Sequence, residues 1–349
     1  MTGARGREPR SEPRLSTIIV AHNSLAHLRS TLPALLSELG PEDEVIVVDS
    51  GSSDGIAGEL GRIAPAARLV VAAGNVGFAA GANLGAAAAQ GELVVLLNPD
   101  ARVQPGWAAA MRAPFAGPWA GWMALVTMHE GSVINTSGGV LHFTGLGWAG
   151  QVGESLTEAP RTPTEVGFLS GACMAVPRAT WTAAGGFPEQ FFMYCEDVDL
   201  SLRLRLRGGR LAVIPDAVAV HDYSFDKGEV KWRMLERNRW ATILRTYPGP
   251  LLVLVLPGLL ATEVAIWLVA LRGGWAQMKA LATLDLIRAL PRLARERREI
   301  QATRQVDAAT FAASMTDELS SDYLGPVARN RVVRSVVRGY WASVRALLR

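Results

Sequence analysis

Cysteine is scarce in this chain, which has two such residues, Cys173 and Cys195, among 349. Two thiols without a CxxC spacing cannot form a disulfide framework, and they fit a reducing cytoplasmic compartment better than secretion. We interpret both as ordinary buried thiols. A large excess of one charge is also lacking, since the formal net charge is only +3. The surplus arginines lie near the two ends of the chain, which argues against a nucleic-acid groove and predicts no nucleic-acid partner.

The N-terminus lacks the apolar core of a signal peptide. Residues 1–14 contain four arginines without such a core, so we predict a disordered basic arm over 1–14. Disorder is excluded for most of the remaining chain, because 49% of all residues are hydrophobic and 19% are charged. A chain of 349 residues can bury one large core or two smaller ones, and its 35 glycines suit a loop-rich α/β enzyme.

Three familiar site signatures are missing as well. No GxGxxG follows the first apolar run and no GxxxxGK[ST] occurs, which argues against dehydrogenases and P-loop enzymes. No HExxH is present, and His22, His27, His129 and His142 show no metal-ligand spacing. A nucleotide site in this chain must therefore be of another kind.

What the first hundred residues do contain is a regular alternation of two patterns. Short apolar, mostly β-branched runs occupy 17–20, 45–48, 69–71 and 93–97, and each gap between them is long enough for one helix. Because these runs are continuous rather than alternating, we expect strands that are covered on both faces. The pattern predicts βαβαβαβ in a mainly parallel sheet, whose ligands bind at the carboxyl ends of the strands.

Polar turns follow these predicted strands. The segment Asp49-Ser50-Gly51-Ser52-Ser53-Asp54-Gly55 follows the second run, and Asn98-Pro99-Asp100 follows the fourth. An acidic group after strand two can accept hydrogen bonds from a base or ribose, and a carboxylate after strand four can hold Mg²⁺ or Mn²⁺ on a diphosphate. Both segments also have plain structural readings, as a helix N-cap with its turn and as a type I turn.

Three carboxylates stand close together farther along the chain. Glu196, Asp197 and Asp199 follow the apolar segment Phe192-Met193-Tyr194-Cys195. Like charges at this spacing repel one another, so the cluster is either exposed or used for proton or metal chemistry. Asp199 and Arg203 stand four residues apart, which favours a structural ion pair on one helical face.

The order of these segments resembles that of family 2 glycosyltransferases of the GT-A fold, most of all the bacterial rhamnosyltransferase branch. The resemblance rests on five ordered motifs between about residues 16 and 221. They are Asp49 to Gly55, Asn75-Val76-Gly77-Phe78-Ala79-Ala80-Gly81-Ala82-Asn83-Leu84-Gly85, Asn98-Pro99-Asp100-Ala101, Gly185-Gly186-Phe187 and Phe192 to Leu200. It implies an enzyme with a Rossmann-like sheet that uses a nucleotide-diphospho-sugar and a divalent cation, Mg²⁺ or Mn²⁺.

The same resemblance implies a role for each matching residue. Asp197 matches the catalytic base, Asp100 and His221 match the metal ligands, and Asp49 would contact the nucleoside base. Glu196 would adjust the pKa of the catalytic base Asp197 or contact the acceptor, and Gly171 would shape the acceptor pocket. The implied nucleotide-sugar site consists of Ala21, Asn23, Asp49, Asn75, Asn83, Asn98, Asp100 and Arg203.

Some positions depart from the family pattern. His22 stands where relatives carry tyrosine, and Asn98 replaces the first acid of a strict DxD motif. Residues 200–207 alternate leucine with polar residues, mostly arginine, and this period of two predicts a strand. The family has a helix there, and we expect the helix.

The character of the chain changes beyond residue 245. Leu251 to Leu271 is a 21-residue segment with one charge, Glu263, which is barely long enough to cross a bilayer. Sugar nucleotides are cytoplasmic and a basic tail with Arg288 and Arg292 also prefers that side, so a single span would separate the two parts. We therefore expect a broken hairpin or an interfacial helix, with a soluble, buried helix as the alternative.

The predicted organisation is a basic arm over 1–14, a GT-A domain over 15–245 and a helical, membrane-associated extension with a basic tail over 246–349. The expected reaction moves L-rhamnose from dTDP-L-rhamnose, with inversion, to a hydroxyl of a cell-envelope glycan or polyprenyl-diphosphate-linked saccharide. The expected place is the cytoplasmic face of the cell membrane. The alternatives are another donor, such as galactofuranose or glucose nucleotides, and a non-catalytic membrane scaffold that binds glycan or nucleotide sugar.

Overall fold

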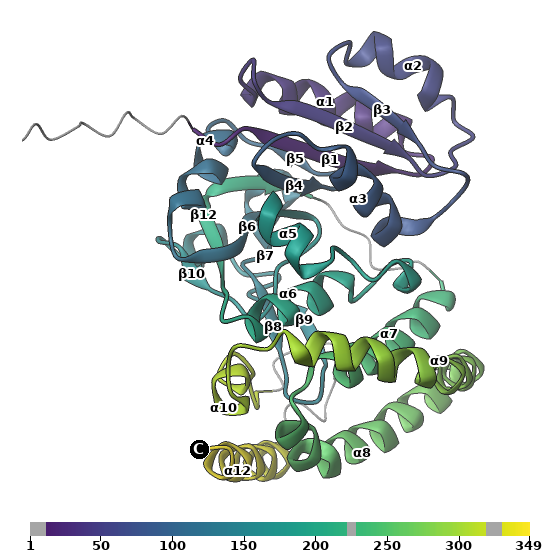
Figure 1. The fold of residues 1–349 in the computed structure, drawn as a ribbon, viewed down its shortest axis with the longest axis vertical. Helices are drawn as coiled ribbons and strands as arrows, with labels where there is room; N and C mark the ends of the chain where they lie inside the picture. The colour runs from purple at the N-terminus through teal and green to yellow at the C-terminus, as the bar shows by residue number, and fades with distance from the viewer. Residues whose placement is uncertain (1–11, 222–227, 319–329) are drawn as a thin grey trace, which may run out of the picture.

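The computed structural model describes residues 12–221, 228–318 and 330–349 (Figure 1). Most of the predicted arm over 1–14 lies outside these residues. The end of the arm that is described binds the domain, because Arg14 donates its backbone N–H to Glu92 and Arg112 donates to the carbonyl of Pro13.

One sheet of ten strands forms the upper part of the molecule, and its main path runs β10-β12-β6-β11-β4-β1-β2-β3. A separate pair, β8 and β9, completes the strands. In chain order the strands are β1 (Leu15–Ala21), β2 (Glu44–Asp49), β3 (Arg68–Val71), β4 (Leu93–Leu97), β5 (Arg102–Val103), β6 (Trp119–Met128), β7 (Val133–Thr136), β8 (Gly139–Leu141), β9 (Gly147–Ala149), β10 (Thr164–Glu165), β11 (Cys173–Pro177) and β12 (Arg210–Val220).

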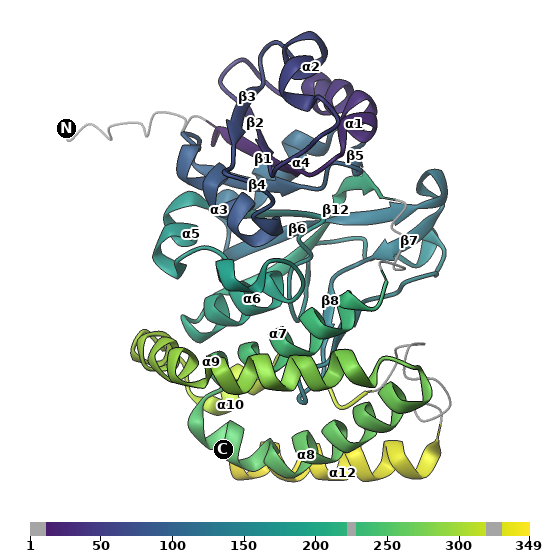
Figure 2. The same ribbon diagram turned by 90° about the vertical axis from the view of Figure 1, so that its right-hand side faces the viewer.

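The four strands expected from the sequence form the half β3-β2-β1-β4, and every pairing within it is parallel. Strands β1, β2 and β4 are almost wholly buried, which agrees with their continuous apolar runs. Helices α1 (Leu25–Glu38) and α3 (Gly77–Ala88) cover opposite faces of this half (Figure 2). The crossover pattern thus places all four strand ends at one edge.

The prediction of a mainly parallel sheet is wrong for the other half. Strand β11 lies antiparallel between β4 and β6, while β12 runs parallel to β6 and antiparallel to β5 and β10. The sheet is therefore mixed. An antiparallel strand inside a sheet is as apolar as a parallel one when both faces are covered, so local pattern does not reveal its direction.

The remaining helices lie mostly after residue 177. They are α2 (Ile56–Ile63), α4 (Trp107–Arg112), α5 (Arg178–Ala184), α6 (Glu196–Leu206), α7 (Val230–Thr246), α8 (Gly249–Arg272), α9 (Ala276–Ala302), α10 (Ala308–Ala312) and α12 (Arg331–Leu347), with short 3₁₀ turns that include η4 (Glu189–Phe191). Helices α8 and α12 form the end of the molecule farthest from β1, β2 and β3 (Figures 1 and 2).

Helix α6 is a helix in spite of its period-two pattern, as the family resemblance implied. Leu200 and Leu204 pack into the core of the sheet, whereas Leu202 and Leu206 pack into a second core formed with the C-terminal helices. Each pair is spaced by four residues, so each lies on one helical face. A helix between two cores needs leucines on both sides, and this produces the apparent alternation.

Helix α7 binds α8 and α9 through a set of four charged side chains, of which Glu263 is partly exposed and the other three are buried. Lys279 of α9 lies 2.5 Å from Glu236 of α7 and 2.6 Å from Glu263 of α8. Arg239 of α7 forms ion pairs with the same two carboxylates at 2.9 and 3.0 Å. Two positive and two negative charges therefore balance at the place where α7, α8 and α9 meet. The predicted limits of the two domains stay a prediction, with α7 ending at Thr246, one residue past the boundary.

Candidate active site

The loops after β1 and β2 bind one another at the carboxyl edge of the sheet. The backbone of Ser50 donates to the carbonyl of Ala21 at 2.8 Å, and Asn23 accepts from the backbone of Ser53 at 2.7 Å. Asp49 is 6% exposed and accepts from the backbone of Ser52 at 2.8 Å. The structure thus brings Ala21, Asn23 and Asp49 together, as expected of residues that share a pocket.

The loop after β3 joins the same edge through Asn75. Its amide lies 3.3 Å from His22 Nε2, and its Oδ1 accepts from the backbone of Gly77. The Ser50 hydroxyl bonds to the Asn75 side chain and to the backbone of Val76. A Cβ at Gly51, where φ is +71°, would lie 2.5 Å from the Asn75 backbone nitrogen, so this close approach requires glycine.

Asp100 lies beyond β4 and meets His221, which follows β12. The carboxylate Oδ1 and the imidazole Nε2 are 3.0 Å apart, with His221 3% exposed and Asp100 about a third exposed. Burial raises the pKa of Asp100, but the hydrogen bond and charge of His221 outweigh it and hold that pKa below its usual value. The backbone of Ala101 donates to the carbonyl of Asn98 at 3.1 Å, so this segment also forms the turn that was the structural alternative.

This pair fits a divalent cation that shares its coordination with a diphosphate. Two neighbouring ligands of an octahedral ion with bonds of about 2.1 Å stand about 3 Å apart, which is the separation of Asp100 and His221. No third His, Cys, Asp or Glu joins the pair among the described residues. Mg²⁺ and Mn²⁺ commonly take one or two protein ligands and complete their shell with phosphate oxygens and water.

Asp197 lies in the first turn of α6 and is held by two backbone amides. Gly171 donates to Oδ2 at 2.9 Å and Val198 donates to Oδ1 at 2.8 Å. Burial raises the pKa of Asp197 above its usual value, although these two hydrogen bonds act in the opposite direction. A half-buried carboxylate with a raised pKa suits proton abstraction near neutral pH, and Gly171 touches it directly.

Glu196 is more deeply buried than its neighbour, with 5% exposure. Burial raises the pKa of Glu196 well above its usual value, and the charge of Asp197 adds to this shift. Glu196 therefore keeps its proton to a higher pH than an exposed glutamate does. A protonated carboxyl can donate a hydrogen bond to a substrate hydroxyl, which agrees with either role predicted for Glu196.

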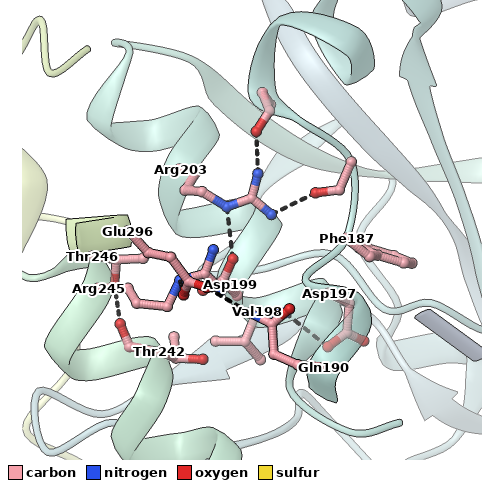
Figure 3. A network of polar contacts seen from close by, with 12 residues as sticks. Phe187, Gln190, Asp197, Val198, Asp199, Arg203, Thr242, Arg245, Thr246 and Glu296 are labelled. Carbon is pink, nitrogen blue, oxygen red and sulfur yellow. Dashed lines mark hydrogen bonds and ion pairs between the residues drawn. The ribbon is translucent and has the colours of Figure 1, made fainter. Parts of the chain in front are cut away.

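The third carboxylate, Asp199, belongs to an ion network (Figure 3). It is fully buried and pairs with Arg203 at 2.6 Å and with Arg245 of α7 at 3.0 Å. Arg245 continues to Glu296 of α9 at 3.1 Å. The structural ion pair expected between Asp199 and Arg203 is confirmed.

Two of the residues predicted to bind nucleotide sugar hold backbone instead. Besides Asp199, Arg203 donates to the carbonyls of Ala184 and Gly186. Asn83 of α3 donates to the Phe187 carbonyl at 2.9 Å and accepts from the Phe187 backbone at 2.9 Å. Both side chains therefore fix the Gly185-Gly186-Phe187 motif, and their contact with a nucleotide stays a prediction.

Sequence reasoning missed two parts of this site. His22 was classed with lone histidines, yet it bonds to the Ser50 carbonyl at 2.8 Å and to Asn75. Asn238 of α7 was not singled out, although it binds the loop that precedes α6. The position of His22 directly after a buried strand was the available signal, whereas nothing in the local pattern marks Asn238.

The sequence of this chain is similar to those of known glycosyltransferases. Residues 16–179 match the family described as "Glycosyl transferase family 2". The "N-acetylglucosaminyl-diphospho-decaprenol L-rhamnosyltransferase" of Mycobacterium tuberculosis is 29% identical over 238 residues, which cover 61% of this chain and 78% of that protein. The "Rhamnosyltransferase WbbL" of Escherichia coli is 33% identical over 98 residues, or 26% of this chain and 37% of that protein.

Two solved structures show the likeness in fold. The "Crystal structure of GalNAc-T7 with UDP, GalNAc and Mn2+" superposes with a TM-score of 0.58 at 15% identity, over 69% of this chain and 49% of that one. The "Crystal structure of S. aureus TarS 1-349 in complex with UDP-GlcNAc" gives a TM-score of 0.53 at 16% identity, over 95% of this chain and 92% of that one. At such identities the likeness concerns the fold alone.

Proposed function

The chain is a family 2 glycosyltransferase, similar to rhamnosyltransferases, and from this premise we propose that it transfers a sugar, with inversion, from a nucleotide-diphospho-sugar to a lipid-linked or polysaccharide acceptor. One observation carries the proposal. The Asp197 carboxylate is held by two backbone amides at the start of α6 and has a raised pKa. Such a group suits removal of a proton from an acceptor hydroxyl.

In the proposed reaction the acceptor oxygen forms a bond to the anomeric carbon while the bond from that carbon to the diphosphate breaks. The acceptor proton moves to Asp197, and the nucleoside diphosphate leaves with the bonding electrons. Asp100 and His221 would hold Mg²⁺ or Mn²⁺, which would neutralise charge on the leaving diphosphate. Asp49 and Asn75 would orient the nucleoside, so that the reacting carbon lies in line with the attacking oxygen.

We further propose L-rhamnose from dTDP-L-rhamnose as the donor sugar and a polyprenyl-diphosphate saccharide as the acceptor. The support is the similarity to the Mycobacterium tuberculosis rhamnosyltransferase, whose name states a decaprenol-diphosphate acceptor. Galactofuranose and glucose nucleotides are the alternative donors, since pocket shape decides this preference. A non-catalytic scaffold remains the alternative of another class, and the amide-held Asp197 favours the enzyme.

The donor is tested by thermal unfolding in Mn²⁺ with a panel of dTDP-, UDP- and GDP-sugars. We expect dTDP-L-rhamnose to raise the melting temperature most, because a ligand that binds only the folded state stabilises it. Transfer from that donor to a polyprenyl-diphosphate-N-acetylglucosamine acceptor is then followed by mass spectrometry. A larger shift with another sugar would contradict the donor, and binding without transfer to any acceptor would favour the scaffold.

We also propose that α8 lies in the cytoplasmic surface of the membrane. Six apolar residues on one face of α8 are 45–71% exposed, namely Val253, Leu256, Leu260, Val264, Leu268 and Leu271. Their spacing of three or four residues gives a continuous stripe, and only 11% of the most apolar window is buried. Glu263 forms ion pairs with Arg239 and Lys279 and accepts a hydrogen bond from Trp240. These contacts bind one face of α8 to α7 and α9, which favours a helix that lies in the interface over one that spans the bilayer.

The helix beside α8 carries exposed arginines, which suit anionic lipid. Helix α12 lies beside α8, and Tyr340 of α12 donates to the carbonyl of Leu254 at 2.6 Å. Its exposed arginines are Arg331, Arg334, Arg338 and Arg345. Basic side chains beside an apolar stripe are typical of helices that lie in the headgroup region of anionic bilayers.

Replacing two stripe leucines by glutamate is expected to weaken membrane binding. In Leu260→Glu/Leu268→Glu, two charges would have to enter the apolar layer, so binding to phosphatidylglycerol-containing vesicles should fall by about 10-fold or more. Co-sedimentation measures the bound fraction. Val71→Glu is the matched control, because Val71 of β3 is 65% exposed at the opposite end of the molecule. Equal binding of the double variant and the control would contradict the proposal.

A further inference from the structure

The loop that leads into α6 has an unusual backbone. We call residues 190–195 the entry loop. Phe192, Tyr194 and Cys195 have φ values of 66°, 71° and 64°, in the region that residues with a Cβ seldom adopt. Such conformations persist only where the surrounding structure holds them, and here the loop ends directly before Glu196 and Asp197.

Asn238 of α7 is the side chain that holds the entry loop. It is fully buried, and its amide nitrogen donates to the carbonyls of Phe191, Met193 and Tyr194 at 3.1, 3.0 and 2.8 Å. Carbonyls in such a loop have no helix or sheet partner, and a buried carbonyl without a donor is costly. One carboxamide therefore satisfies three of them.

The neighbouring Arg237 fixes the orientation of this amide. Its Nε donates to Asn238 Oδ1 at 2.9 Å, so the amide nitrogen is directed toward the loop. The same guanidinium donates to the carbonyls of Gln190 and Phe191 at 3.2 and 2.9 Å. Arg237 and Asn238 together bind four consecutive or near-consecutive carbonyls of one short loop.

Helix α3 holds the loop from the other side. The backbone of Ala79 donates to the Phe192 carbonyl at 3.0 Å. A Cβ at Gly77, where φ is +79°, would lie 2.5 Å from both the ring and the carbonyl of Phe192. The entry loop is thus fixed between α3, at the nucleotide edge, and α7.

We propose that Asn238, oriented by Arg237, is a positioning residue that sets the place of the base Asp197 through the entry loop. The role of Asp197 as base rests on the proposed function, whereas the contacts of Asn238 with the entry loop do not depend on it. A misplacement of a reacting group by about 1 Å can cost on the order of 100-fold in rate. Glu196 is the single residue between the end of the entry loop and Asp197, so a shift of the loop is passed on to Asp197.

The test compares Asn238→Ala and Asn238→Asp with the full-length parent. Asn238→Asp keeps the oxygen that Arg237 binds but replaces the NH₂ group by a second carboxylate oxygen. This oxygen cannot donate to the loop carbonyls, and its negative charge repels them. We expect kcat to fall by about 100-fold in both variants, while the donor KM and the donor Kd from calorimetry change less than two-fold. Unchanged kcat in a folded Asn238→Asp protein would overturn the proposal.

Arg233→Gln is the control for a merely structural effect. Arg233 lies one turn earlier on α7, and its guanidinium binds Asp285 of α9 at 2.7 and 3.0 Å rather than a loop carbonyl. It should lower thermal stability without lowering kcat of the folded protein. An equal loss of kcat in Arg233→Gln would show that α7 acts only through folding. Should Asn238→Ala fail to fold, Arg237→Ala removes two loop contacts and is expected to lower kcat by about 10-fold.

Hydrogen exchange separates this inference from the proposed function. The amides of Gly171 and Val198 donate to Asp197, so release of the loop should speed their exchange by about 10-fold or more in the Asn238 variants and not in Arg233→Gln. A parent protein that transfers no sugar, with this exchange pattern intact, would remove the proposed function alone. Unchanged exchange in the Asn238 variants would remove the positioning role.

Discussion

Asp197→Asn is expected to lower kcat by about 1000-fold and to leave donor and metal binding nearly unchanged. An asparagine has one acceptor oxygen, so it can keep only one of the hydrogen bonds that Gly171 and Val198 donate to the two oxygens of Asp197. Its size and shape are those of the aspartate, so the fold of α6 should persist. The asparagine cannot take a proton, and loss of a general base typically costs 10² to 10⁴ in rate, about 1000-fold in the middle of that range. Single-turnover transfer and donor calorimetry measure the two effects.

The pH dependence gives an independent check on the same residue. As the proposed base, Asp197 would act only when deprotonated, and burial raises its pKa. The rate should therefore fall in acid at a higher pH than an ordinary aspartate would allow, and it should rise to a plateau above that raised pKa. The residual rate of Asp197→Asn should lack this acidic limb. A variant that kept both the limb and the parental rate would show that the base is another group.

Lys279→Met is expected to lower the free energy of unfolding by about 3–5 kcal/mol, the usual cost of removing one partner from a buried ion pair. Lys279 is 1% exposed and contacts Glu236 at 2.5 Å and Glu263 at 2.6 Å. Without it, the buried Glu236 and the partly exposed Glu263 share Arg239 alone, and one negative charge is left uncompensated. Denaturant unfolding at neutral pH measures the change.

The sign of its pH dependence follows from Glu236. Burial raises the pKa of Glu236, but Arg239 and Lys279 together hold that pKa below the ordinary value of 4.5. The stabilisation is thus present at neutral pH and is lost as pH falls, so parent and variant should converge in acid. Arg288→Met is the control on the same helix, since its side chain is 77% exposed. A loss below about 1 kcal/mol in Lys279→Met, the scale of a surface pair, would contradict the account.

The parallel half of the fold could be predicted because each strand carries its own signal. The runs around Ile18, Val47 and Leu96 are continuous and buried on both faces, so their burial can be inferred from a few neighbouring residues. The direction and order of β6, β11 and β12 depend on pairings between residues far apart in the chain, such as Met174 with Met123. No local pattern encodes these pairings.

The candidate site divides in the same way. Asp100 and Asp197 follow recognisable segments, and Asp100 lies beside His221, the residue with which the resemblance grouped it. No local pattern predicts the contact of Asp197 with Gly171. Asn238 lies 44 residues beyond Tyr194 in a helix whose own pattern is ordinary. Its proposed role depends on three loop carbonyls that accept hydrogen bonds from its amide. These carbonyls belong to a loop with several positive φ values, and this backbone geometry is visible only in the folded chain.

The position of α6 between two cores has a thermodynamic consequence. Its leucines belong alternately to the core of the sheet and to the core of the C-terminal helices. Neither core can open without removing part of its packing from the helix that carries Asp197. The two halves of the molecule are therefore expected to unfold as one cooperative unit, and loss of the C-terminal helices is expected to disable the base as well.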